Sequence, residues 1–131
     1  MSRTNHILLN YPEDPKRNVT VAVYEKWRDT QKQDEIAEFI HQRLYRRYLK
    51  PFEFVDSTYK KEFKNGFSIM ANCCLLIEAF ESFYRGWGVS KSEIAFLKFF
   101  TRVPQFAEFS QSDIPTQFYK HIRCGILHLG E

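Results

Sequence analysis

The sequence predicts an all-α fold, an up-down bundle of about four or five helices behind an irregular N-terminal arm. Apolar residues recur at spacings of three and four over most of the chain after residue 34, which is the helical period. Glycine and proline are scarce, at 5 each in 131 residues, which suits helices better than a turn-rich sandwich. A hydrophobic fraction of 44% and an aromatic fraction of 17% argue against disorder.

The chain is expected to be a single helical domain over residues 1–131, because this length is enough to enclose one core. Residues 1–17 are expected to form the irregular arm, which contains Pro12 and Pro15. Residues 18–24 then alternate valine with polar or small residues. They indicate a short strand or an extended lead-in, and a helix beginning near Val21 fits equally well.

A helix is predicted from Asp34 to Lys50, because acidic residues suit its start and Pro51 stops it. After a connector at Phe52 to Tyr59, the longest helical pattern runs from Phe63 to Tyr84. Its apolar residues cover most of the helix circumference, so we expect it to be central and the most buried helix. Glu78 and Glu81 interrupt it, and each is expected to be solvated unless it reaches a histidine or arginine in a cleft.

Two further helices complete the bundle. The Gly86-Trp87-Gly88 segment ends the long helix at a C-cap glycine. Ser90 to Glu93 then has the S-x-x-E spacing of a capping box, and it opens a helix that runs to about Phe100. Ser112 or Asp113 is expected to cap the last helix, with Pro115 in its first turn.

Targeting signals and cysteine usage indicate a cytoplasmic protein without a membrane partner. The first 11 residues lack the apolar run of a signal peptide, and the most apolar window, Ile69 to Phe80, contains Asn72 and Glu78. The three cysteines, Cys73, Cys74 and Cys124, are an odd number with two adjacent, which is not a disulfide framework.

Arg123 and His128 on the last helix are the candidate catalytic residues. An arginine keeps its proton and presents a fork of donors that suits phosphate. A histidine can give or take a proton near neutral pH. Together they are the minimum set for breaking a phosphodiester, since one group holds charge and the other moves the proton.

This R-x4-H spacing late in a small helical chain resembles the HEPN superfamily (higher eukaryotes and prokaryotes nucleotide-binding). Members that carry the motif are typically metal-independent ribonucleases of toxin or phage-defence type that act as dimers. The resemblance implies that His128 is general base or acid when a ribose 2′-hydroxyl attacks the adjacent phosphate, that Arg123 stabilises the developing charge, and that no cofactor is needed. It also implies RNA as substrate and an antitoxin protein as a potential partner.

Residues that could support this site are Cys124, His121, Glu78 and Tyr119. Cys124 and His128 lie four apart on one helix face beside His121, a spacing that can also share a metal. A zinc site needs about four ligands, and only Cys73 or Cys74 could add one. Because no C-x2-C pair or H-E-x-x-H motif is present, no metal site is expected.

A basic line on the helix from Asp34 to Lys50 is the candidate RNA-binding surface. The net charge is only +3, so the distribution of charge matters more than the total. The candidate residues are Arg43, Arg46, Arg47 and Lys50, with Lys120 on the last helix. A solvated helix face whose long stems cover the edge of the core explains the same line equally well.

The spacing of the motif also predicts a homodimer. Five residues turn a regular helix by roughly 140° and raise it about 7.5 Å, so Arg123 and His128 point in different directions. One chain could aim both at a single phosphate only if the helix were distorted near Gly125. A two-fold axis beside the last helix would instead let two copies share one groove with two arginines and two histidines.

Two alternatives remain at this point. One is a HEPN-like module without catalysis that serves dimerisation, regulation or RNA binding; it is favoured by Cys124, which stands where active members commonly have a polar residue after the motif arginine. The other is a fragment of a larger protein, since the chain stops three residues after His128 and related helices commonly run further.

Overall fold

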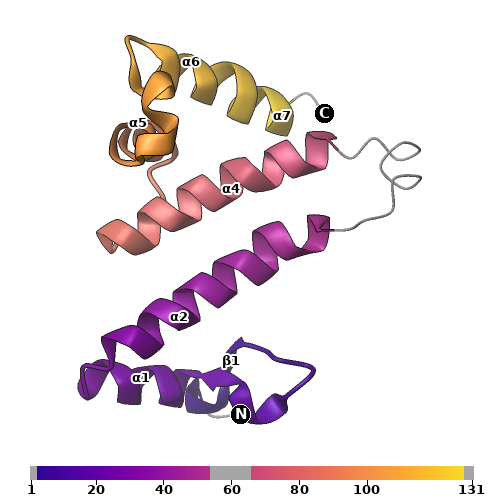
Figure 1. Ribbon diagram of the computed structural model, residues 1–131, viewed down its shortest axis with the longest axis vertical. Coiled ribbons are helices and arrows are strands. Elements are labelled where there is room, and N and C mark those ends of the chain that lie inside the picture. The colour runs from indigo at the N-terminus through magenta and orange to yellow at the C-terminus, as the bar shows by residue number, and fades with distance from the viewer. Residues whose placement is uncertain (1–2, 54–65, 129–131) are drawn as a thin grey trace. The chain divides into compact units, whose positions relative to one another are not determined.

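The computed structural model describes residues 3–53 and 66–128, except for the side chains of Leu127 and His128 (Figure 1). Of the described residues, 77% are helical and 4% are in strands, so the all-α prediction is confirmed. Most of the connector expected at Phe52 to Tyr59 lies outside the described residues. So do the first three residues of the helix expected from Phe63 to Tyr84.

The chain divides into two compact units, Met1–Arg47 and Tyr48–Glu131. Each unit has a core of its own. The buried residues of the first core are Leu9, Tyr11, Val19 and Phe39. Those of the second are Cys74, Phe96 and Phe100. Each unit is therefore described by itself.

In the first unit, strand β1 (Ile7–Leu9) pairs antiparallel with strand β2 (Val19–Thr20). The N-terminal arm is thus not wholly irregular, because its apolar residues pair with the segment that precedes the first helix. Helix α1 (Val21–Asp29) begins directly after β2, and the Thr20 side chain accepts a hydrogen bond from the Val23 N–H at 3.3 Å. Residues 18–24 therefore contain both the short strand and the helix start that the sequence allowed.

The helix expected from Asp34 to Lys50 is present, with a change of geometry at its end. Helix α2 (Gln33–Leu44) passes into a π-helical segment, Tyr45–Leu49, and then into a 3-10 turn, Lys50–Phe52. Two further 3-10 turns, Arg3–Asn5 and Pro15–Arg17, lie in the N-terminal arm.

The second unit contains the long helix α4 (Gly66–Arg85), α5 (Ser92–Arg102) and a helical run at the C-terminal end of the described chain. A 3-10 segment, Pro104–Ser110, leads into that run. The run consists of α6 (Ile114–Phe118), a π-helical segment (Tyr119–Arg123) and α7 (Cys124–His128). In Figure 1 it lies beside the other two helices, with α6 against α5 and α7 against α4.

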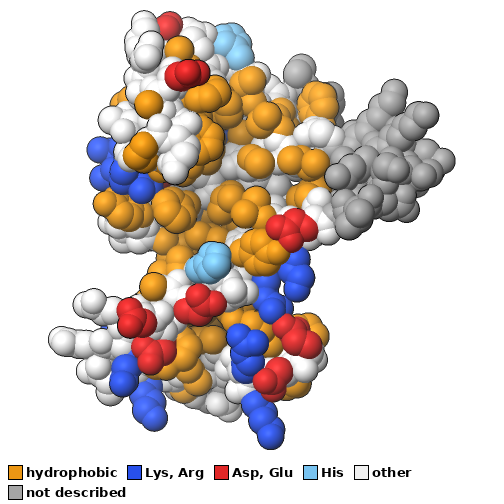
Figure 2. Space-filling model, in the orientation of Figure 1, with side chains coloured by type: hydrophobic (Ala, Val, Ile, Leu, Met, Phe, Trp, Pro, Cys, Tyr) orange, Lys and Arg blue, Asp and Glu red, His pale blue; other side chains and the backbone are white. Residues whose placement is uncertain are grey.

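Helix α5, rather than α4, carries the fully buried apolar side chains, so the prediction of the most buried helix is wrong. Ala95 and Phe96 are 0% exposed and Phe100 is 2% exposed. On α4, by contrast, Phe67 is 68% exposed and Tyr84 is 61% exposed. Figure 2 shows hydrophobic side chains spread over the surface of this unit. The reason is geometric: α4 is apolar around most of its circumference, and its neighbours contact only part of it.

The ends of these helices confirm some expected caps and correct others. Gly86 has a φ of 67°, and the Trp87 N–H donates to the Ser82 carbonyl at 2.9 Å, which is the expected glycine C-cap of α4. The capping box is wrong: α5 has Lys91 at its N-cap position and no side-chain cap. Asp113 is the N-cap residue of α6, although its side chain makes no capping hydrogen bond.

By length and composition alone, α4 is long and apolar enough to cross a membrane. Within its most apolar window, 22% of the residues are buried. The core helix of a soluble protein meets the same two criteria, so they do not assign α4 to a membrane.

Candidate functional site

Arg123 is held by a buried carboxylate on the neighbouring helix. Its Nε donates to Glu78 Oε1 at 2.7 Å, and its Nη2 lies 3.5 Å from Ser92 Oγ. The Arg123 side chain is 19% exposed and that of Glu78 is 9% exposed. A buried charge needs such a partner, because an unpaired one would lose its hydration without compensation. Arg123 therefore connects the last helical run to both α4 and α5.

This contact corrects the expectation that Glu78 is solvated and confirms that it could reach an arginine. Burial by itself lowers the pKa of Arg123, but the hydrogen bond and the charge of Glu78 raise it, and the net result is a raised pKa. The guanidinium therefore stays charged, and its orientation is fixed by donors on Nε and Nη2.

One side of Arg123 faces a crevice with a free volume of about 0 Å³, lined by Ala71, Cys74, Leu75, Arg123 and Ile126. This crevice has no room for a phosphodiester. The Arg123 side chain is 19% exposed, so a ligand would have to approach its exposed part.

The last helical run is distorted just before the motif rather than near Gly125. The five residues Tyr119–Arg123 form a π-helical segment, in which the Cys124 N–H donates to the Tyr119 carbonyl. A Cβ built at Gly125 would meet no atom within 4 Å, so the packing does not require glycine there. Residues Cys124–His128 return to α-helical geometry. The rotation of roughly 140° over five residues still applies between Arg123 and His128, because the distortion precedes that stretch.

Of His128, the structure describes only the backbone, at the end of α7; its side chain lies outside the described part. His121 and Lys120 are exposed. The structure thus brings Arg123 and Glu78 together and leaves His121 and Lys120 on the surface of the run.

Tyr119 and Cys124 flank Arg123. The Arg123 guanidinium carbon lies 5.6 Å from the centroid of the Tyr119 ring, and that ring also packs on Phe96 at 6.1 Å. A hydrogen bond with the Cys124 side chain, followed by burial, raises the pKa of Tyr119. Tyr119 is therefore a neutral phenol at neutral pH. Its ring packs on Phe96 of the core and lies beside the Arg123 guanidinium.

The other two cysteines differ in burial. Cys74 is buried in the core of the second unit, and burial raises the pKa of its thiol to about 11, while Cys73 is half-buried. Cys74 is thus a thiol packed in the core, where it behaves as a small apolar side chain. Among residues 3–53 and 66–126, no three His, Cys, Asp or Glu side chains cluster as metal ligands would.

Two arginines of the candidate RNA-binding line, Arg43 on α2 and Arg46 in the π-helical segment after it, make contacts within the first unit. Arg43 Nη1 donates to the Leu8 carbonyl of β1. Arg46 forms an ion pair with Glu13 at 2.6 Å, and its guanidinium lies 4.3 Å from the Tyr11 ring centroid. The hydrogen bond with Glu13 raises the pKa of Arg46 against the opposing effect of burial.

The remaining members of the line are free to meet solvent. Arg47 and Lys50 are both exposed. Arg43 and Arg46 therefore contact the N-terminal arm, whereas the Arg47 and Lys50 side chains are exposed to solvent.

Comparisons of the chain with known protein families, with curated proteins and with solved structures find no match.

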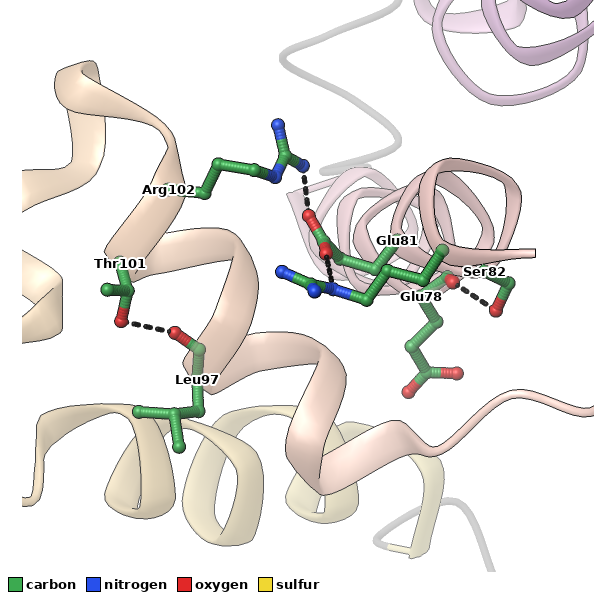
Figure 3. Close-up of polar contacts among 7 residues, drawn as sticks. Glu78, Glu81, Ser82, Leu97, Thr101 and Arg102 are labelled. Atoms are coloured by element: carbon green, nitrogen blue, oxygen red, sulfur yellow. Dashed lines mark hydrogen bonds and ion pairs between the residues drawn. The ribbon is translucent and has the colours of Figure 1, made fainter. Parts of the chain in front are cut away.

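Glu81, expected to be solvated unless it reached a histidine or arginine, is a second buried carboxylate in the same unit and pairs with two arginines. Glu81 is 0% exposed, and its two oxygens accept from Arg85 Nε at 3.0 Å and from Arg102 Nη2 (Figure 3). The sequence contained one indication of this pairing. Two glutamates three residues apart in an apolar helix must either be exposed to water or form ion pairs with cationic side chains. Arg85, four residues after Glu81, marks the second outcome.

Proposed function

We propose that this chain is a metal-independent endoribonuclease of the HEPN type, acting in a toxin or phage-defence role. The observation that supports it best is the fixed position of Arg123 on the last helical run, held by Glu78 five residues before His128. A π-helical segment ends at that arginine, and such distortions are frequent at functional sites. A charged group with a fixed orientation can stabilise a transition state without reorganising during the reaction.

In the proposed reaction, His128 takes the proton of a ribose 2′-hydroxyl as O2′ attacks the adjacent phosphorus. The bond from phosphorus to O5′ breaks, and the leaving oxygen takes up a proton from a second acid. Arg123 donates to the phosphate oxygens, where negative charge builds up. The products are a 2′,3′-cyclic phosphate and a 5′-hydroxyl, and the step needs neither water nor metal.

The active unit in this proposal is a homodimer in which the last helical runs of two copies face each other. The crevice beside Arg123 has no free volume, which favours an RNA-binding groove that forms outside it. A second copy placed around a two-fold axis would supply the other wall of that groove and a second histidine. The histidine of one chain could then act as base on a phosphate that the arginine of the other chain holds.

The activity test must separate a catalytic arginine from a structural one. We expect purified protein with EDTA to cleave mixed RNA, and His128→Gln to cleave it about 10²–10³-fold more slowly. The double variant Glu78→Met/Arg123→Met replaces the buried ion pair with apolar side chains of similar length, so it should fold and yet lose cleavage to a similar degree. Glu78→Gln keeps Arg123 and an acceptor for its Nε but removes the countercharge, so it should cleave more slowly than wild type and faster than the double variant. A folded double variant that cleaves at the full rate would refute a catalytic Arg123.

For the dimer, we expect light scattering at micromolar concentration to give twice the chain mass. Mixing inactive His128→Gln with the inactive Glu78→Met/Arg123→Met variant should restore part of the cleavage, since a mixed dimer retains one arginine and one histidine. A strict monomer that cuts RNA would contradict the shared groove.

A second candidate function, an RNA-binding or regulatory HEPN-like module without catalysis, is favoured by one observation. The Arg123 guanidinium is already occupied by Glu78, and it lies beside a closed crevice. In that case the wild-type protein would bind RNA without cleaving it. The Glu78→Met/Arg123→Met variant would bind RNA as tightly as the wild type does.

A further inference from the structure

A second positively charged site lies in the second unit, away from Arg123. It is an open pocket of about 430 Å³ between the end of α4 and the end of α5. The pocket is lined by Tyr84, Arg85, Leu97, Lys98, Thr101 and Arg102. Three of these six side chains are cationic, and none is acidic.

Glu81 holds the two arginines of this pocket in fixed positions. Its carboxylate is fully buried and receives one guanidinium on each oxygen, from Arg85 of α4 and from Arg102 of α5 (Figure 3). The Arg102 guanidinium also lies 4.0 Å from the Tyr84 ring centroid and 5.2 Å from that of Phe80. Ordering two long side chains in advance reduces the entropy that a ligand would otherwise have to overcome.

Several donors in this arrangement lack an acceptor. Arg102 Nε is buried without a hydrogen-bond partner, which is costly for a charged group. The Arg102 side chain is 26% exposed, and a ligand would meet this exposed part of it. Lys98 makes no hydrogen bond or ion pair with any residue that the structure describes. Each guanidinium gives one donor to Glu81 and so has donors left over.

The charge of the pocket selects among anions. Three cations and the single Glu81 carboxylate leave a net charge of two positive units. A phosphate monoester carries about −1.5 to −2 at neutral pH and offers three acceptor oxygens. A diester, such as an RNA backbone phosphate, carries one negative charge, so it matches this pocket less well. Tyr84, at 61% exposure, adds an aromatic edge on which a planar group of the ligand can rest.

We propose that this pocket binds a small organic phosphate monoester, held by Arg85, Lys98 and Arg102, with its organic part against Tyr84. The site is separate from the proposed ribonuclease site, so either can hold without the other.

The test uses phenyl phosphate as the probe, titrated calorimetrically into the full chain at low ionic strength in a phosphate-free buffer. We expect saturable one-to-one binding that weakens as salt is added. Methyl phenyl phosphate, the matching diester, should bind roughly tenfold more weakly because it has lost one charge. Failure to saturate with phenyl phosphate, or equal affinity for the diester, would overturn the proposal.

Lys98→Glu is the deciding variant, because this side chain has no described partner whose loss could unfold the protein. It should weaken phenyl phosphate binding by roughly tenfold or more while the circular dichroism spectrum stays unchanged. Lys91→Glu makes the same change of net charge at an exposed lysine outside the pocket and should bind as wild type does. Equal affinities for the wild type and Lys98→Glu, or equal weakening by both variants, would show that the pocket does not hold the phosphate.

Discussion

Replacing Arg123 with alanine is expected to lower the free energy of unfolding by about 3–5 kcal/mol, the usual cost of leaving a buried charge without its partner. Glu78 would keep its place in the interior, where it is 7% exposed, and would lose the donor that lies 2.7 Å from its Oε1. Chemical denaturation followed by circular dichroism measures this loss. A ribonuclease test that used only Arg123→Ala would therefore confuse lost chemistry with lost structure.

The double variant Glu78→Met/Arg123→Met should recover most of this stability, because both charges leave the interior together. Lys120→Ala, an exposed position three residues before Arg123, should stay within about 0.5 kcal/mol of wild type. If Arg123→Ala proved as stable as Lys120→Ala, the ion pair with Glu78 would not hold the last helical run in place.

Replacing Phe96 with alanine is expected to cost about 3–5 kcal/mol, the range for emptying a fully buried aromatic position. Phe96 is 0% exposed, and its ring lies 5.4 Å from the ring of Phe118 and 6.1 Å from that of Phe100. It thus contacts the last helical run as well as its own helix. The loss would appear as a shift of the denaturation midpoint with an unchanged slope.

Leu97→Ala is the matched control for Phe96→Ala, since Leu97 is the next residue on α5 and is 50% exposed. It should change the stability by less than about 1 kcal/mol, because a half-exposed side chain leaves no closed cavity behind. Equal losses for the two variants would contradict the burial of α5. They would restore the expectation that α4 is the central helix.

Local sequence patterns were enough to locate most helices of the described chain and several of their ends. The period of three to four residues identified the segments that became α2, α4, α5 and the last helical run, since local periodicity follows directly from helix geometry. Gly86 was identified as a C-cap because only a residue without a Cβ adopts a positive φ at little cost. Asp113 was identified as one of two possible N-cap positions. All of these features depend on neighbours along the chain.

Packing between segments that are distant in sequence sets which charges are buried and which groups they pair with. Glu78 and Arg123 are 45 residues apart in sequence, and Arg43 reaches across 35 residues to the Leu8 carbonyl. No local pattern encodes such distances. The same limit explains why α4 was expected to be the most buried helix: its period shows which side chains are apolar, but not which of them a neighbour covers. Whether a carboxylate in an apolar helix faces water or a buried guanidinium depends on the partner that packing brings to it.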